Sequence, residues 1–166
     1  MPLNSIVQST VSQYAGARYA GQIDTLQVNN VTDAVLDTAV AGFGVPLART
    51  ATGVKPFTLV GDIFAGFTVR KHTVMNSYNS TVSPTYAIGS VPPILNFGYI
   101  TVPVESNVTE GGSIFIRYGV GAGGSVLGAI RADADTATAV EIPTVKFAES
   151  ALAGELVRVV ITQIVL

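Results

Sequence analysis

The sequence predicts an all-β fold, namely a single-domain antiparallel β-sandwich or barrel of about eight strands with an extended N-terminal arm. Three observations predict this fold. Short runs of apolar and β-branched residues recur after residue 30, and glycine, proline, asparagine or aspartate separates them. Residues 1–30 lack such runs, and a length of 166 residues suits one hydrophobic core. We therefore expect an arm over residues 1–30 and one β domain over residues 31–166.

The N-terminal residues are small and polar around Tyr14 and Tyr19, without a sustained helical or strand period. Two interpretations remain open. Many such segments are disordered termini. Tyrosine, however, offers a large contact area at a low entropic cost, so the arm could become ordered by contacting a neighbouring subunit during assembly.

The β domain shows the alternation of side chains expected of strands. In the segment 113–118, Ile114, Ile116 and Tyr118 share one face, which we expect to lie in the core. Two segments, 32–41 and 147–153, could form short helical turns instead, although β-branched residues weaken the first case. The predicted strands cover residues 31–40, 57–63, 67–74, 94–104, 113–120, 126–131, 144–147 and 156–165.

The last predicted strand is apolar on both faces. Val157, Val159 and Ile161 line one side, and the opposite side carries a second apolar set. A strand that is apolar on both faces lies centrally in a sandwich or packs against another subunit. The candidate contacts with a neighbouring protein are Tyr14 and Tyr19 of the arm and Leu156, Val160 and Ile164 of this strand.

The composition favours association. Only 12% of the residues are charged and 48% are hydrophobic, whereas an average domain has about 25% charged residues. So few charges leave apolar patches exposed, and such patches usually mark contact surfaces. The alternative is a chain that is merely rich in alanine and glycine.

Several function classes are disfavoured. A net charge of −2 with scattered charges gives no sign of a nucleic-acid partner. The chain has no cysteine, which excludes disulfides and thiolate metal sites. We also expect no membrane association, because the first residues do not resemble a signal peptide and no apolar run approaches 18 residues.

Three motifs could carry chemistry, but each has a simpler explanation. The segment 119–124 has the G-x-G-x-x-G spelling of nucleotide-binding loops, yet the residues that follow predict a strand rather than a helix, so we expect a hairpin loop. His72 is the single histidine and lies within a strand pattern, where exposure or a subunit contact is favoured over catalysis. Asp133 and Asp135 have the spacing that opens a calcium loop, but the other ligands are missing. We predict no catalytic residues, no cofactor and no metal site.

The order of several segments resembles the head decoration family of tailed bacteriophages, also called structural cement proteins. The similarity spans about residues 40–162 and lies in glycine turns and short strands rather than in a catalytic signature. The matching segments are residues 41–47, 61–68, 86–91, 95–102, 108–116 and 145–159.

The resemblance implies a non-enzymatic role. Such a protein binds the outer surface of the expanded head at junctions between capsomers, commonly as a homotrimer, with the major capsid protein as its partner. The implied location is the capsid surface of the virion, after synthesis in the host cytoplasm. Two alternatives remain, another virion structural role in the tail, fibre or shell and, third, a ligand-binding or enzymatic β-barrel.

Overall fold

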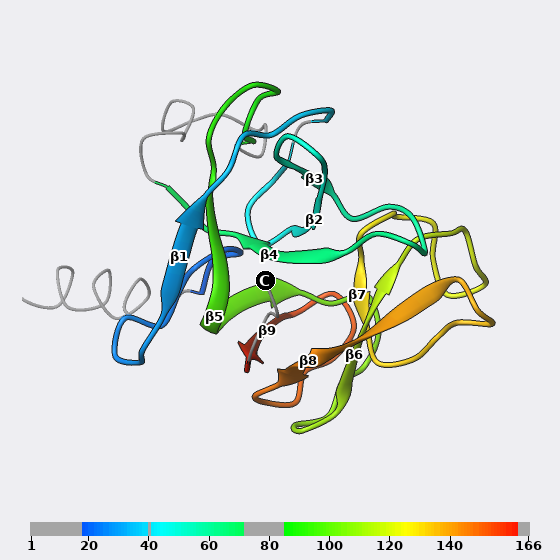
Figure 1. The fold of residues 1–166 in the computed structure, drawn as a ribbon. Helices are drawn as coiled ribbons and strands as arrows, with labels where there is room; N and C mark the ends of the chain where they lie inside the picture. The colour runs from blue at the N-terminus through cyan, green and yellow to red at the C-terminus, as the bar shows by residue number, and fades with distance from the viewer. Residues whose placement is uncertain (1–17, 40, 72–84, 163–166) are drawn as a thin grey trace, which may run out of the picture.

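The computed structural model describes residues 18–39, 41–71 and 85–162. Within these residues the chain forms nine β-strands and no helix, which confirms the predicted all-β fold (Figure 1). The predicted helical turns at 32–41 and 147–153 are therefore absent from the described residues. The strands are β1 (Asn30–Asp33), β2 (Pro46–Arg49), β3 (Val54–Pro56), β4 (Phe64–Thr68), β5 (Pro93–Pro103), β6 (Ser113–Arg117), β7 (Ile130–Arg131), β8 (Ala139–Phe147) and β9 (Leu156–Ile161).

The nine strands of the described chain form one antiparallel sheet in the order β3-β2-β4-β5-β9-β8-β6-β7, and β1 pairs with β5. The long strand β5 joins the two halves of the sheet, because its first residues pair with β4 and its last residues pair with β9. The sheet curls until β7 meets the end of β5, where Glu105 N donates to Ile130 O at 2.9 Å and Val104 bridges Ile130. The result is a barrel-like enclosure, visible on the right of Figure 1.

The main core fills this enclosure. It consists of alternating side chains from β5, β6, β8 and β9, such as Ile100, Ile116, Phe147 and Val159, all at most 1% exposed. The predicted alternation in the segment 113–118 holds for Ile114 and Ile116, which are fully buried. Tyr118 is half-buried, and its hydroxyl donates to Ala137 O at 2.5 Å.

A second apolar cluster lies on the other face of β2 and β4. There Phe43 and Tyr86 pack edge to face with their ring centroids 5.4 Å apart, beside Leu47 and Leu36. Burial raises the pKa of Tyr86 to about 12, and its hydroxyl donates to Val69 O at 2.6 Å. All five residues of β4 are buried, so β4 is covered on both faces.

Some predicted strands are wrong or shorter than expected. The segment 57–63 is a loop, because the Asp62 carboxylate accepts hydrogen bonds from the amides of Thr58 and Leu59 and closes a turn. Within the predicted strand 126–131 only Ile130 and Arg131 are extended. The strand β2 was not predicted, because its four residues contain a proline and show no clear alternation.

Residues 18–24 of the predicted arm lie along β5. Gly21 N donates to Thr101 O at 2.8 Å, and Asp24 N donates to Tyr99 O at 3.1 Å. Residues 1–17 lie outside the described residues, so the predicted arm boundary at residue 30 stays a prediction. No helix in the described part of the chain is long and apolar enough to span a membrane.

Candidate functional site

The predicted contact residues that the structure describes are Tyr19, Leu156 and Val160; Tyr14 and Ile164 lie outside the described residues. Tyr19 is exposed, and the guanidinium of Arg70 lies 4.3 Å from its ring centroid. Leu156 and Val160 are half-buried on the outer face of β9, whose other face lies in the core. These two side chains are therefore partly open to solvent.

Ion pairs fasten residues 18–24 to β9 and to the connection that precedes it. Arg158 Nη1 lies 3.1 Å from Asp24 Oδ2, and Arg18 pairs with Glu149. Glu149 also accepts a hydrogen bond of 2.8 Å from Arg158 N. Burial alone would raise the pKa of Glu149, but these hydrogen bonds from Arg18 and Arg158 lower it below its usual value. The first described residues of the chain are thus held against the sheet by charge as well as by backbone pairing.

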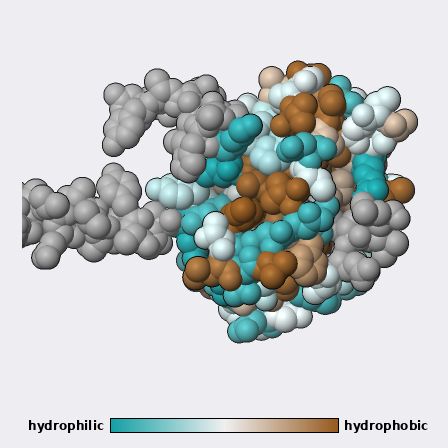
Figure 2. Space-filling model, turned by 60° about the vertical axis from the view of Figure 1, so that its left-hand side comes forward, coloured by the Kyte–Doolittle hydropathy of each residue, from teal (hydrophilic) through white to brown (hydrophobic). Residues whose placement is uncertain are grey.

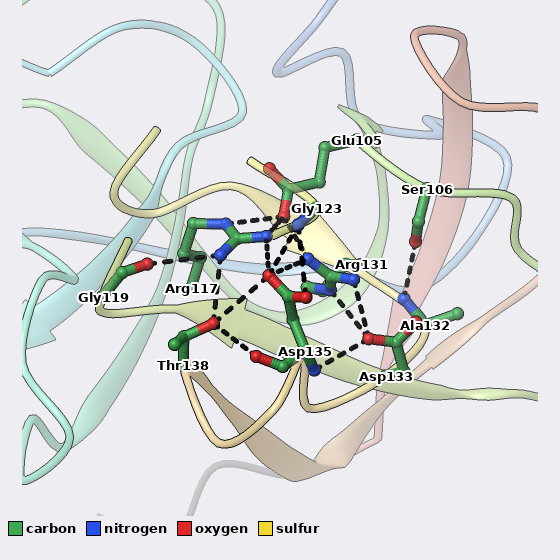
Figure 3. Close-up of polar contacts among 10 residues, drawn as sticks. All are labelled: Glu105, Ser106, Arg117, Gly119, Gly123, Arg131, Ala132, Asp133, Asp135 and Thr138. Atoms are coloured by element: carbon green, nitrogen blue, oxygen red, sulfur yellow. Dashed lines mark hydrogen bonds and ion pairs between the residues drawn. The ribbon is translucent and has the colours of Figure 1, made fainter. Parts of the chain in front are cut away.

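A buried ion-pair cluster braces the loops that follow β6 and β7 (Figure 3). Arg117 is completely buried, and its Nη2 lies 2.6 Å from Glu105 Oε1 and 2.7 Å from Asp135 Oδ2. Arg131 Nη1 contacts the same two oxygens at 3.0 and 2.9 Å. Its Nη2 also pairs with the more exposed Asp133 at 2.7 Å. Two arginines thus share two buried carboxylates.

The cluster shifts the ionisation of its members. The hydrogen bond with Arg117 lowers the pKa of Asp135 below its ordinary value. The hydrogen bond with Glu105 raises the pKa of Arg117, although burial opposes this. Asp135 and Arg117 are therefore charged near neutral pH. The carboxylates of Asp133 and Asp135 bind arginine, and no three metal-ligating side chains cluster within the described residues.

The segment 135–137 turns in a left-handed conformation beside the cluster. Asp135, Thr136 and Ala137 have φ angles of 39°, 58° and 63°, which non-glycine residues rarely adopt. Thr138 N and Ala139 N both donate to Ala134 O, at 2.9 and 3.1 Å. Such strain persists only where the surroundings over-determine it, and here the pairing of Asp135 with the two arginines supplies that constraint.

The glycine-rich segment 119–124 packs against this cluster and forms a tight turn, closed by the bridge between Gly121 and Gly124. Gly123 N donates to the Asp135 carboxylate at 3.2 Å. A Cβ atom on Gly121 would overlap Asp135 Oδ2, and one on Gly124 would lie 2.7 Å from Glu105 Oε2. The spelling of a nucleotide-binding loop therefore reflects close approach to buried carboxylates, and the predicted hairpin loop agrees with this turn.

The sequence patterns did not predict this cluster. Its acids and bases come from residues 105, 117, 131 and 135, whose spacing follows no motif. One signal was available, because Arg117 and Arg131 each follow an isoleucine of a strand that is otherwise apolar. Charged side chains there are almost never fully buried unless they are paired.

Two surfaces of the described chain are apolar and exposed. The first lies on the loops 57–63 and 119–128, where Val60, Ile63, Val120 and Val126 are more than half exposed. A pocket of about 290 Å³ next to it is lined mainly by apolar groups of residues 44–46, 103–105 and 126–130. No residue from Gly119 to Ile130 is charged.

The second apolar surface surrounds β1. Leu26 and Val28 are 91% and 79% exposed, and Val31, Val35 and Phe97 are each about 40% exposed. Figure 2 shows hydrophobic residues gathered in patches on the side of the molecule that carries β1. Such patches are typical of contact surfaces.

Comparisons with known proteins agree with these features. A protein of the capsid of Myoviridae phage XM1 has a similar structure, with a TM-score of 0.72 and 17% identity over 89% of this chain and 91% of that chain. At this identity the likeness shows the fold. The N base of head fibre gp8.5 of bacteriophage phi29 superposes less well, with a TM-score of 0.42 and 12% identity over 84% of this chain and 98% of that chain. No curated protein sequence matches the chain.

The family comparison covers nearly the whole sequence. The structural cement protein family, described by E217 gp24 and Pam3 gp6, matches residues 7–162. This match includes most of the predicted arm and the entire described β domain, and it confirms the predicted resemblance. The chain belongs to the structural cement protein family of bacteriophages.

Proposed function

We propose that this cement protein binds the outer surface of the expanded phage head at junctions between capsomers and holds neighbouring capsid subunits together. The observation that carries the proposal is the family match over residues 7–162. The major capsid protein is the proposed partner. A protein that binds only the assembled shell stabilises it by mass action, and many identical weak contacts add up to a strong attachment.

The surface chemistry supports attachment through apolar contact. Fifteen large hydrophobic side chains are exposed in the described residues, including those on the loops 57–63 and 119–128 and those around β1. We propose Tyr19, Leu156 and Val160, together with Tyr14 and Ile164, as capsid or subunit contacts. A surface of roughly 800 Å² on each partner would suffice for specific attachment.

Co-sedimentation with undecorated heads of the same phage tests the proposal. The wild-type protein should pellet with heads and saturate at a fixed copy number. Val160→Lys should weaken binding at least about tenfold, since it places a charge in the proposed contact. The matched control Ile88→Lys changes an exposed residue outside that contact and should bind as the wild type does. A wild-type protein that stays in the supernatant would refute the proposed function.

We propose a homotrimer as the assembled unit. Closed symmetric oligomers cover apolar surface without leaving a free contact that could extend into fibres. Mass determination in solution and on heads tests this, and a monomer in both states would refute it.

We further propose that the protein has no enzymatic activity. Glu105 and Asp135 bind arginine side chains, so neither is free to act as a general acid or base. The remaining candidate, His72, lies outside the described residues. A phage that carries His72→Ala should grow normally, and loss of a catalytic product in that variant would contradict this proposal.

A further inference from the structure

We infer that the outer edge of β1 receives residues 1–17 of a neighbouring copy as an added strand, so that the arms link copies to one another. This inference rests on the proposed function, because it names how neighbouring cement subunits join. It assigns a surface, β1, and an occupant, the uncharged N-terminal segment.

The first observation is an open sheet edge. One edge of β1 pairs with β5, with Val31 opposite Leu95 and Asp33 opposite Pro93. All four residues of β1 are exposed, and no backbone hydrogen bond between described residues reaches its other edge. Proteins usually protect such edges with lysine or proline. The sequence Asn-Val-Thr-Asp contains neither; it is short, ends in Asp33 and has an irregular register between Asn30 and Val31, but its outer backbone groups remain open to another strand.

The second observation is the apolar surface around this edge. Val31 lies on β1, Phe97 lies opposite Asn30 on β5, and Leu26 and Val28 lie in the loop that leads into β1. Added strands gain affinity from backbone hydrogen bonds and specificity from alternate side chains that meet such pockets and patches. Figure 2 shows hydrophobic patches on this side of the molecule.

The third observation concerns the occupant. Residues 1–17 contain no lysine, arginine, aspartate or glutamate, and they include Leu3, Ile6, Val7, Val11 and Tyr14. Segments that remain solvated on their own are usually rich in charge. An uncharged segment with these apolar side chains matches the apolar side chains exposed around β1. Extended, 17 residues reach about 56 Å, which is enough to cross to an adjacent copy.

The direction of the chain favours a neighbouring copy over the same copy. Residues 21–24 run antiparallel to β5 beside Tyr99 and Thr101, and β1 then continues in the same direction beside Phe97 to Pro93. The chain therefore runs from Arg18, the first described residue, towards β1. Arg18 forms an ion pair with Glu149. The point at which residues 1–17 join the described chain thus lies at the end of this path opposite to β1 of the same copy.

Cysteine crosslinking tests the inference cleanly, because the chain has no native cysteine. Two full-length proteins with different tags are mixed, one carrying Val31→Cys and the other Ser5→Cys, Ser9→Cys or Ser12→Cys. After mild oxidation, free and on heads, at least one arm position should give a mixed-tag disulfide dimer. Leu152→Cys, an exposed position in the connection from β8 to β9, is the matched control and should give at least tenfold less of this product.

Three outcomes overturn the inference. These are the absence of a mixed-tag dimer in both states, an equal yield with Leu152→Cys, and a double variant with both cysteines that forms only an intramolecular disulfide. Co-sedimentation of the wild type separates the two proposals. Pelleting without crosslinks removes only the arm inference, whereas crosslinks without pelleting remove only the capsid-binding function.

Discussion

Replacing Arg117 with methionine should destabilise the protein strongly. The Arg117 side chain is fully buried, and its Nε donates to Glu105 Oε1 at 2.7 Å. Its Nη1 donates to Gly119 O at 3.2 Å and to Thr138 Oγ1 at 3.1 Å. Methionine keeps much of the length and the packing of the side chain but removes every one of these hydrogen bonds and the positive charge.

The expected loss is about 3 kcal/mol in the free energy of unfolding, at the low end of the range for breaking a buried ion pair. The low end applies because Arg131 still contacts Glu105 and Asp135. For a chain of this size, 1 kcal/mol shifts Tm by about 2–4 °C, so the variant should melt about 6–12 °C below the wild type.

Thermal unfolding monitored by circular dichroism, with urea titration at 25 °C, measures this loss. Arg158→Met is the matched control, because the Arg158 side chain is 41% exposed and pairs with Asp24. Exposed ion pairs contribute about 0–1 kcal/mol, so the control should lose at most about 4 °C. If Arg117→Met melts no lower than Arg158→Met, the cluster does not brace the loops as described.

Three further predictions concern stability. Acid should destabilise the protein only below about pH 5, because the pKa values of Asp62 and Asp135 are lowered from 3.8 and that of Glu149 from 4.5. The stabilising effect of these groups is complete above the unfolded values and is lost as the pH falls through the lower folded values. Urea midpoints that already fall between pH 7 and pH 5 would contradict this. Thr68→Val should lower the free energy of unfolding, measured in urea, by about 1–3 kcal/mol, because the buried hydroxyl donates to Gly42 O at 2.6 Å and accepts from Val45 N at 2.9 Å. An unchanged urea midpoint would show that Gly42 O and Val45 N find other partners. Gly98→Ala should lower the free energy of unfolding by about 1–3 kcal/mol, because Gly98 has a φ of 115° and a Cβ atom there would overlap Asn29 Oδ1. The control Gly111→Ala has a φ of 76° but open space around the new Cβ atom, so it should cost less. Equal losses in the two variants would refute the role of Asn29.

The period of two identified the strands whose two faces differ. Ile114 and Ile116 in β6 were expected on a core face and are fully buried, and so are Val157 and Val159, which were expected to share one face of the last strand. In β9 the outer face was harder to judge from the sequence. Arg158 on that face pairs with Asp24, and Glu149 before β9 pairs with Arg18, so both contacts join residues more than 130 positions apart.

Long-range pairing also explains the features that sequence patterns missed. Asp62 converts an apolar run into a turn by accepting two backbone hydrogen bonds, an effect that no hydrophobic period reveals. The buried cluster joins Glu105, Arg117 and Asp135 across three separate segments. A single sequence shows which residues are charged but not which of them meet in the fold.

The burial of these charges has a consequence for attachment to the head. Of the 9 basic and 11 acidic residues, the buried cluster takes Arg117, Arg131, Glu105 and Asp135, all with side chains at most 17% exposed. The surface is therefore even poorer in charge than the composition suggests, and contacts with the capsid should be mainly apolar. Salt screens exposed charges but scarcely weakens apolar contact. We expect the affinity for heads to change less than about threefold between about 50 and 500 mM NaCl, measured by co-sedimentation. A drop of tenfold or more would mean that charged side chains carry the attachment and that the apolar surfaces serve another purpose.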